Sequence, residues 1–254
     1  MNNLPNSNKK ESTFFWYDSV IIWGILFLVQ LFVFSYITAY LLIATGWQFN
    51  IFSQFLGSYG SGIGVWIALF ITEFGTFLIS ILYLKLRKTT NSEIEDLAGI
   101  DNINSKNILL GLLYVPVTFF TGIIVSIIQS LFIQDPSHSY TYNLVFSPKN
   151  GWELLIWISI MLLVVGPVEE IVFRGIIQKG IQNTFKKYEK PEWYSIFLGS
   201  LLFTIYHVDL LHFIPIFFMG LLLGLVFYFT DSSLVCALTH GVYDVISITL
   251  MFLA

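Results

Sequence analysis

Long, uninterrupted runs of apolar residues separated by short polar segments dominate the chain. Each run approaches the roughly 20 residues that an α-helix needs to cross the hydrocarbon core of a bilayer. The runs lack the in–out alternation of a lipid-facing strand, so helices are favoured over a barrel. The pattern predicts about seven membrane-spanning helices, with six or eight as alternatives because the fifth run is short: Val20–Ala44, Gly62–Leu84, Ile108–Phe132, Leu154–Phe173, Ser195–Val208, Phe213–Phe229 and Leu234–Leu253.

The composition supports an all-α, polytopic transmembrane bundle in contact with the lipid bilayer. Of the 254 residues, 56% are hydrophobic and 11% are charged, whereas soluble domains carry about 25% charged residues. The net charge is −4, and no basic cluster is interleaved with aromatic residues, so the chain is not expected to bind nucleic acid. The lone cysteine, Cys236, excludes an intramolecular disulfide and a multi-cysteine metal site.

The first apolar run is longer than the h-region of a signal peptide, which is about 7–15 residues, so it is expected to remain as the first span. Orientation follows from Lys and Arg, which are enriched in cytoplasmic loops. Seven alternating spans predict a cytoplasmic N-terminus in a plasma membrane, since they put ten of the twelve basic residues on one side: Lys9, Lys10, Lys85, Arg87, Lys88, Lys106, Lys179, Lys186, Lys187 and Lys190. The longest polar loop, RKTTNSEIEDLAGIDNINSKN, is predicted to hold a short surface helix around Ile94 and Leu97.

Ionisable side chains interrupt the apolar runs, and such residues indicate function in membrane proteins. A charged residue at the centre of a span costs about 2.5–3.5 kcal/mol to insert, so these groups are expected to face one another or water inside the bundle. Most lie in residues 151–254, the C-terminal part of a single membrane domain whose residues 1–150 hold the N-terminal spans and loops. The ionisable residues are Glu73, Glu169, Glu170, Arg174, His207, His240 and Asp244.

Helical spacing predicts how these groups face one another. Glu170 and Arg174 are four residues apart and share a helix face, as do His240 and Asp244. Glu169 is turned by about 100° from Glu170 and can point into the bundle. Counting along the spans at 1.5 Å per residue puts Glu169 and His207 at similar depth near the middle of the bilayer. The preceding Gly166-Pro167 removes a helix hydrogen bond and can kink or widen the backbone.

The stretches EEIVFR, FTIYH and HGVYD resemble the three motifs, EExxxR, FxxxH and HxxxN/D, of the CPBP intramembrane proteases, which include the type II CAAX prenyl endopeptidases and the bacterial Abi proteins. The resemblance covers about the last hundred residues and implies that residues 151–254 are the catalytic core. Each motif alone is unspecific, whereas the three in order, each on its own span, are specific. The resemblance implies an endopeptidase acting on a membrane-embedded peptide or a lipidated protein.

The same resemblance implies roles for individual residues. Glu169 and His207 are expected to activate a water molecule, with His240 and Asp244 stabilising the oxyanion or holding the catalytic groups. Glu170 and Arg174 are expected to shape the site. In the prenyl endopeptidases the third motif ends in Asn, and an ionised Asp cannot donate a hydrogen bond. Asp244 is therefore expected to be protonated, to orient His240, or to bind a metal.

The sequence leaves three questions open. Glu169, His207, His240 and Asp244 form a set of oxygen and nitrogen donors that Zn²⁺ accepts, but HExxH is absent, and metal-dependent and metal-free hydrolysis are both compatible with the sequence. A non-proteolytic membrane factor, such as a bacteriocin immunity protein or a scaffold, and a proton-coupled transporter are the alternative functions. The size and composition favour a bacterial protein, and for a bacterial member the family resemblance implies substrates such as leader peptides or pheromone precursors. Glu73 matches no motif and is assigned a structural or lipid-headgroup role.

Overall fold

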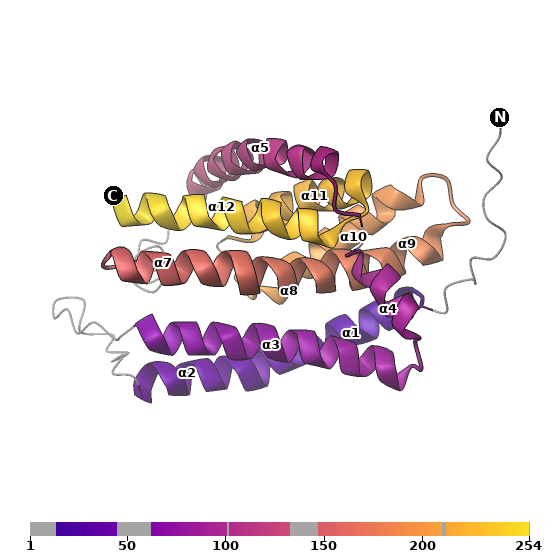
Figure 1. The fold of residues 1–254 in the computed structure, drawn as a ribbon, viewed down its shortest axis with the longest axis horizontal. Helices are drawn as coiled ribbons and strands as arrows, with labels where there is room; N and C mark the ends of the chain where they lie inside the picture. Colours follow the sequence, from indigo (N-terminus) through magenta and orange to yellow (C-terminus); the bar gives the residue numbers. More distant parts are fainter. Residues whose placement is uncertain (1–13, 45–61, 101, 133–146, 210–211, 254) are drawn as a thin grey trace.

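The computed structural model describes residues 14–44, 62–100, 102–132, 147–209 and 212–253. Within these ranges all regular structure is helical, so the predicted helical bundle is confirmed (Figure 1). In chain order the elements are α1 (Trp16–Val29), the π-helical η1 (Gln30–Phe34), α2 (Ser35–Ala44), α3 (Gly62–Leu86), α4 (Asn91–Ala98), α5 (Ser105–Ser130), α7 (Gly151–Ile160), the π-helical η2 (Met161–Val165), α8 (Gly166–Glu170), the π-helical η3 (Ile171–Gln178), α9 (Lys179–Phe185), α10 (Pro191–Tyr206), α11 (Phe213–Thr230) and α12 (Ser233–Leu253).

Six helices of the described chain are long and apolar enough to cross a membrane. They coincide with six of the seven predicted spans, and the remaining predicted span is α10, which has only 16 residues. The six are Trp16–Tyr40, Gly64–Leu86, Ser105–Ser130, Gly151–Phe185, Phe213–Thr230 and Ser233–Leu253. The N-terminal tail, the loop after the first span and most of the predicted external loop lie outside the described residues.

The fourth span differs most from its predicted bounds, because it continues twelve residues beyond Phe173 to Phe185 as one 35-residue helix, Gly151–Phe185. The sequence predicted an end near Arg174, where polar residues begin. In the structure these polar residues have protein partners instead of lipid. Arg174 is fully buried, and Lys179 lies 3.8 Å from the Asp96 carboxylate and 3.4 Å from that of Asp231.

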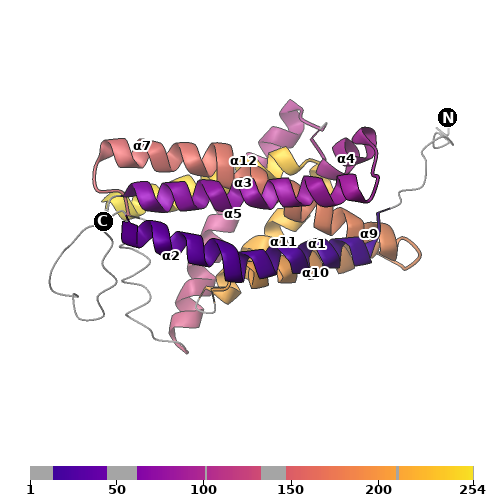
Figure 2. The same cartoon turned by 90° about the horizontal axis from the view of Figure 1, so that it is seen from below.

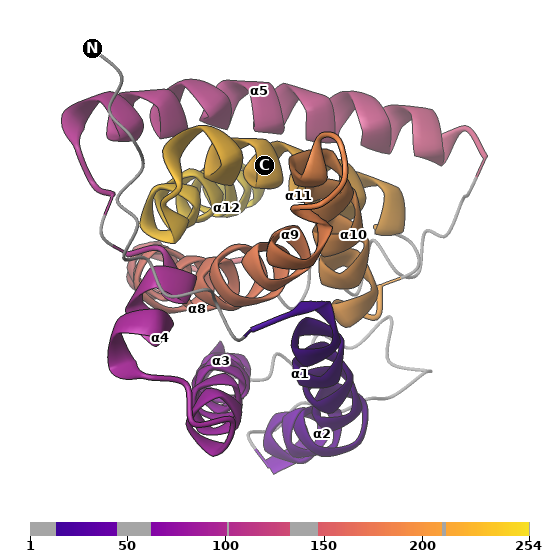
Figure 3. The ribbon, with the colours of Figure 1, turned by 90° about the vertical axis from the view of Figure 1, so that its right-hand side faces the viewer.

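This long helix runs through the middle of the molecule between two groups of helices. Figure 1 shows α1–α3 on one side of it and α10–α12 on the other, with α5 outermost, and Figure 3 shows the same arrangement end-on. Seen from the α1–α3 side, α3 lies beside α1 and α2 (Figure 2). Residues at the middle of the long helix, including both glutamates of α8, are therefore surrounded by protein.

The outer faces are apolar and exposed, as expected for a surface that contacts lipid tails. Among the exposed hydrophobic residues are Phe132 (81%), Leu163 (75%) and Tyr36 (75%). Soluble monomers rarely expose apolar patches on this scale. The interior contains a core of fully buried residues contributed by the long helix, α10 and α11, including Phe173, Ile176, Phe203 and Leu223.

The predicted surface helix is confirmed as α4. It begins with a capping box between Thr90 and Glu93 and ends at Gly99, whose φ of +63° suits glycine. Its C-terminal end packs tightly against the long helix, since a Cβ atom on Gly175 would lie 2.7 Å from the Ala98 carbonyl oxygen. The polar loop thus covers one end of the bundle.

Candidate active site

The ionisable residues of the three motifs lie on neighbouring helices, because α8 packs against α12 and η3 packs against α10. The group is shielded from its surroundings on most sides, and the side chains of His207 and Asp244 remain partly accessible, at 25% and 21%. The residues and their elements are Glu169 and Glu170 of α8, Arg174 of η3, His207 directly after α10, and His240 and Asp244 of α12.

Glu170 links the long helix to α12. One carboxylate oxygen, Oε2, lies 3.0 Å from Arg174 Nε, and the other, Oε1, lies 3.0 Å from His240 Nδ1. All three side chains are almost completely buried, and the Arg174 guanidinium also lies over the Phe203 ring at 4.5 Å. A buried charge is stable only when it is paired and hydrogen-bonded. Glu170 therefore compensates Arg174 and holds the His240 imidazole in a fixed orientation.

His207 is oriented by the backbone of its own helix. Its Nδ1 lies 2.8 Å from the Phe203 carbonyl oxygen, and because a carbonyl only accepts, Nδ1 donates this hydrogen bond. The other ring nitrogen, Nε2, faces Glu169 Oε1, 3.8 Å away. The helix stops here, with Val208 at a φ of +53°. The FxxxH motif thus places both the histidine and the carbonyl that orients it.

Glu169 lies between the two histidines. Its Oε1 is 3.8 Å from His207 Nε2 and its Oε2 is 3.9 Å from His240 Nδ1. Both separations are too long for a direct hydrogen bond. A water molecule can bridge polar groups at such a separation. Glu169 is 6% exposed, and its Oε2 has no hydrogen-bond partner among the described residues, so it remains available to a substrate or a water molecule.

Asp244 lies beside the second nitrogen of His240, with Oδ2 3.4 Å from Nε2. Since His240 Nδ1 donates to Glu170, an ionised carboxylate would face the Nε2 lone pair of a neutral ring. His240 and Asp244 together therefore need one additional proton, either on His240 Nε2 or on the Asp244 carboxylate. This contact is compatible with two of the three roles that the sequence left open, a protonated Asp244 and an Asp244 that orients His240.

Two glycines bring the polar helices together. A Cβ atom on Gly166 would lie 2.8 Å from the Ala237 carbonyl oxygen, and one on Gly241 would lie 3.0 Å from the Met161 carbonyl oxygen. Larger side chains would separate α8 from α12 and so separate the glutamates from His240. The sequence indicated a backbone irregularity at Gly166-Pro167, and π-helical segments do flank α8 on both sides.

Glu73 of α3 also belongs to this region, although no motif contains it. It is 4% exposed, and it interacts electrostatically with Glu169 and His240. A lipid-headgroup role is therefore wrong for Glu73, because its side chain points into the bundle. The only sequence signal that could have placed it here is its ionisable side chain within an apolar span.

The donor groups meet only part of the requirements of Zn²⁺, which in catalytic sites takes three protein ligands and a water molecule. Among the described residues, ligand atoms that lie within 4.8 Å of one another belong to Glu169, Glu170 and His240. Glu170 is already engaged, since one oxygen accepts from His240 and the other pairs with an arginine. His207 and Asp244 lie outside this group. The arrangement therefore fits a water molecule held by Glu169 and His207 better than a zinc ion.

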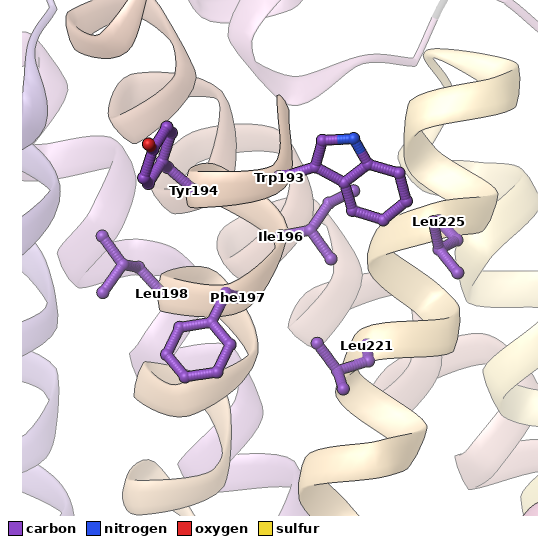
Figure 4. Close-up of a pocket in the computed structure, with 7 residues that line it drawn as sticks. All are labelled: Trp193, Tyr194, Ile196, Phe197, Leu198, Leu221 and Leu225. Atoms are coloured by element: carbon purple, nitrogen blue, oxygen red, sulfur yellow. The ribbon is translucent and has the colours of Figure 1, made fainter. Parts of the chain in front are cut away.

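A separate apolar pocket of about 570 Å³ lies between α10 and α11. Figure 4 shows aromatic side chains of α10 and leucines of α11 around it. It contains no ionisable group apart from a tyrosine, so it suits an apolar chain and offers no hydrolytic chemistry. Its lining residues are Trp193, Tyr194, Ile196, Phe197, Leu198, Leu221 and Leu225.

Comparison with known proteins identifies the segment that carries the site. Residues 151–246 match the family model described as type II CAAX prenyl endopeptidase Rce1-like. The matched range contains every motif residue from Glu169 to Asp244 and confirms the resemblance drawn from the three motifs. No curated protein and no solved structure matches the chain.

Proposed function

Because residues 151–246 carry the Rce1-like type II CAAX prenyl endopeptidase segment, we propose that the protein is an intramembrane endopeptidase in which Glu169 and His207 activate the attacking water. The observation that carries this proposal is the position of Glu169 Oε1, 3.8 Å from His207 Nε2, the ring nitrogen that does not bond to Phe203. In the proposed mechanism the His207 ring is neutral and Nε2 is an acceptor. A water molecule between Glu169 Oε1 and His207 Nε2 donates one hydrogen to each acceptor, which leaves an oxygen lone pair free to attack.

The reaction then follows general acid–base chemistry. The water oxygen bonds to the carbonyl carbon of the scissile peptide while Glu169 takes one water proton. The tetrahedral intermediate collapses when the C–N bond breaks, and the proton passes from Glu169 to the leaving amine. Glu169 returns to its starting form, so each cycle consumes one water molecule and releases a carboxylic acid and an amine.

Other side chains hold this pair in place. Glu170 and Arg174 neutralise each other within the bundle, and Glu170 orients His240 through Nδ1. His240 in turn lies 3.9 Å from Glu169 Oε2, where it can stabilise negative charge on the site. Asp244 Oδ2 lies 3.4 Å from Nε2, the second ring nitrogen of His240. We assign Asp244 a positioning role.

The substrate we propose is a peptide segment that is embedded in the membrane or carried there by a lipid anchor. Glu169 lies near the middle of the 35-residue helix Gly151–Phe185, so a soluble polypeptide would have to enter the bilayer to reach it. For orientation, we place the N-terminus in the cytoplasm. The ends of α3 and α9 and the start of α5 meet at one end of the bundle (Figure 1), and most basic residues flank these points.

Comparative peptidomics of membranes tests this function even while the substrate is unidentified. Membranes containing the wild type, Glu169→Gln, His207→Ala or the control Glu153→Gln are incubated, and released peptides are quantified. Removing a general base lowers the rate by about 10²–10⁴-fold, so products of the wild type and the control should disappear in the other two. Glu153 lies at the start of the same long helix, where its carboxylate accepts hydrogen bonds from the Lys149 backbone N–H and the Asn150 side-chain amide. Equal products from all four proteins, each shown to be folded, would rule out catalysis.

A further inference from the structure

A buried polar face of α3 lies outside the matched segment and next to the site. Glu73, Thr76 and Ser80 follow one another at helical spacing and are 4%, 0% and 0% exposed, so this face points into the protein. The Thr76 hydroxyl lies 2.8 Å from the Tyr206 hydroxyl, and Tyr206 directly precedes His207. The polar face of α3 therefore meets the end of α10 that carries the catalytic histidine.

Glu73 differs from the other polar residues of this face because one of its carboxyl oxygens lacks a partner. Ser80 Oγ donates to the Thr76 carbonyl oxygen, and Thr76 itself bonds to α10. Glu73 Oε2 has no hydrogen-bond partner among the described residues. The carboxyl group of Glu73 is also close enough to Glu169 and His240 for electrostatic interaction. An unsatisfied buried acceptor of this kind is rare in folded proteins.

The position of Glu73 suits a contact with substrate. In Figure 3, α3 and α12 lie on opposite sides of α8, so the helix of Glu73 and the helix of His240 flank the helix of Glu169 from different sides. A peptide that unwinds to expose one bond to hydrolysis loses the internal hydrogen bonds that a membrane requires of its backbone. A carboxyl group accepts hydrogen bonds from N–H and, when protonated, also donates one to a carbonyl oxygen.

We propose, on the basis of the endopeptidase function above, that Glu73 is a substrate-binding residue whose carboxyl group hydrogen-bonds to the peptide backbone beside the scissile bond. Such a contact does two things. It gives the unwound backbone a partner inside the membrane, and it fixes which peptide bond faces Glu169. Glu73 thereby extends the site beyond the matched segment into the N-terminal spans.

Two substitutions at this position separate hydrogen bonding from other roles. Glu73→Gln keeps one acceptor oxygen and gains a donor, whereas Glu73→Leu removes all hydrogen bonding at similar volume. Peptides released from membranes containing each variant are quantified, and the bonds that are cut are identified by mass spectrometry. Glu73→Leu should reduce product formation about tenfold, the equivalent of a lost hydrogen bond, and spread cleavage over neighbouring bonds. Glu73→Gln should cut the wild-type bonds at a similar rate.

Ser80→Ala is the matched control, because Ser80 lies two turns along the same buried face and its hydroxyl donates to the Thr76 carbonyl oxygen of its own helix. It should leave both rate and cleavage position unchanged.

Unchanged products from Glu73→Leu would overturn the proposal, as would an equal loss of product formation in Glu73→Gln. A loss of rate with unchanged cleavage positions and lowered thermal stability would mean a purely structural role. If Glu169→Gln also releases wild-type products, the endopeptidase function itself fails. If Glu169→Gln blocks release and Glu73→Leu does not, the endopeptidase function stands and Glu73 has no role in it.

Discussion

Glu170 Oε1 lies 3.0 Å from His240 Nδ1, and this contact joins two residues that are 70 positions apart in the chain. The same carboxylate pairs with Arg174 at 3.0 Å. One side chain thus balances a buried cation and sets the direction in which the imidazole points. We therefore propose different roles for the adjacent glutamates: Glu170 organises the site, and Glu169 reacts.

Glu170→Gln should destabilise the protein strongly. The change removes the negative charge and leaves the Arg174 guanidinium buried and unpaired, and breaking a buried pair costs about 3–5 kcal/mol. Thermal unfolding in detergent measures the loss, with the partly exposed Glu153→Gln as control. Unfolding temperatures that match for the two variants would contradict the pairing role of Glu170.

Replacing both charges should separate stability from function. In Glu170→Met/Arg174→Met no unpaired charge remains, and apolar substitution of a buried ion pair is often neutral for stability. We expect this double variant to be more stable than Glu170→Gln and still inactive, because His240 Nδ1 has lost its acceptor. Restored peptide release in the double variant would show that Glu170 does not act through His240.

Gly166→Ala should open the contact between α8 and α12. The added Cβ would lie 2.8 Å from the Ala237 carbonyl oxygen, and forcing extra volume into a packed interface costs about 1–3 kcal/mol. We expect lower thermal stability together with slower peptide release. Gly24→Ala is the control, since a Cβ there meets nothing within 4 Å. Equal behaviour of the two variants would mean that close helix approach does not position the site.

The sequence predicted the helical fold and most of the site because both depend on local spacing. Apolar runs determine spans, and positions four residues apart share a face, so Glu170–Arg174 and His240–Asp244 follow from the sequence alone. The observed distances of 3.0 Å and 3.4 Å agree with that geometry. The motifs then supplied the partners on separate helices.

What the sequence did not predict depends on contacts between distant segments. Glu73 is 4% exposed because α3 packs against the long helix. Its ionisable side chain within an apolar span indicates an inward direction, but the sequence does not indicate which helix it meets. The extension of the fourth span to Phe185 depends on α4 and on Asp231, which satisfy Lys179. The close approach at Gly166 likewise needs Ala237 from another helix.

Asp244→Asn should retain much of the activity, whereas Asp244→Ala should lose most of it. Asn keeps an acceptor oxygen and adds a donor, so it can still bond to His240 Nε2 whether or not that nitrogen is protonated. Ala leaves Nε2, 3.4 Å from Oδ2 in the wild type, without a partner. Rates of peptide release from membranes measure both variants. Equal rates for Asn and Ala would show that Asp244 does not orient His240.

Removing metal ions should leave peptide release unchanged. A catalytic zinc site needs three protein ligands. Among the described residues, the ligand atoms of Glu169, Glu170 and His240 lie within 4.8 Å of one another. Glu170 is already bonded to His240 and paired with Arg174. Membranes are treated with phenanthroline, and the purified protein is assayed for zinc. A non-chelating isomer of phenanthroline controls for effects on the bilayer. Loss of activity with phenanthroline but not with its non-chelating isomer, followed by recovery on adding Zn²⁺, would contradict the water-activating role that we assign to Glu169 and His207. Glu169 would then be a metal ligand.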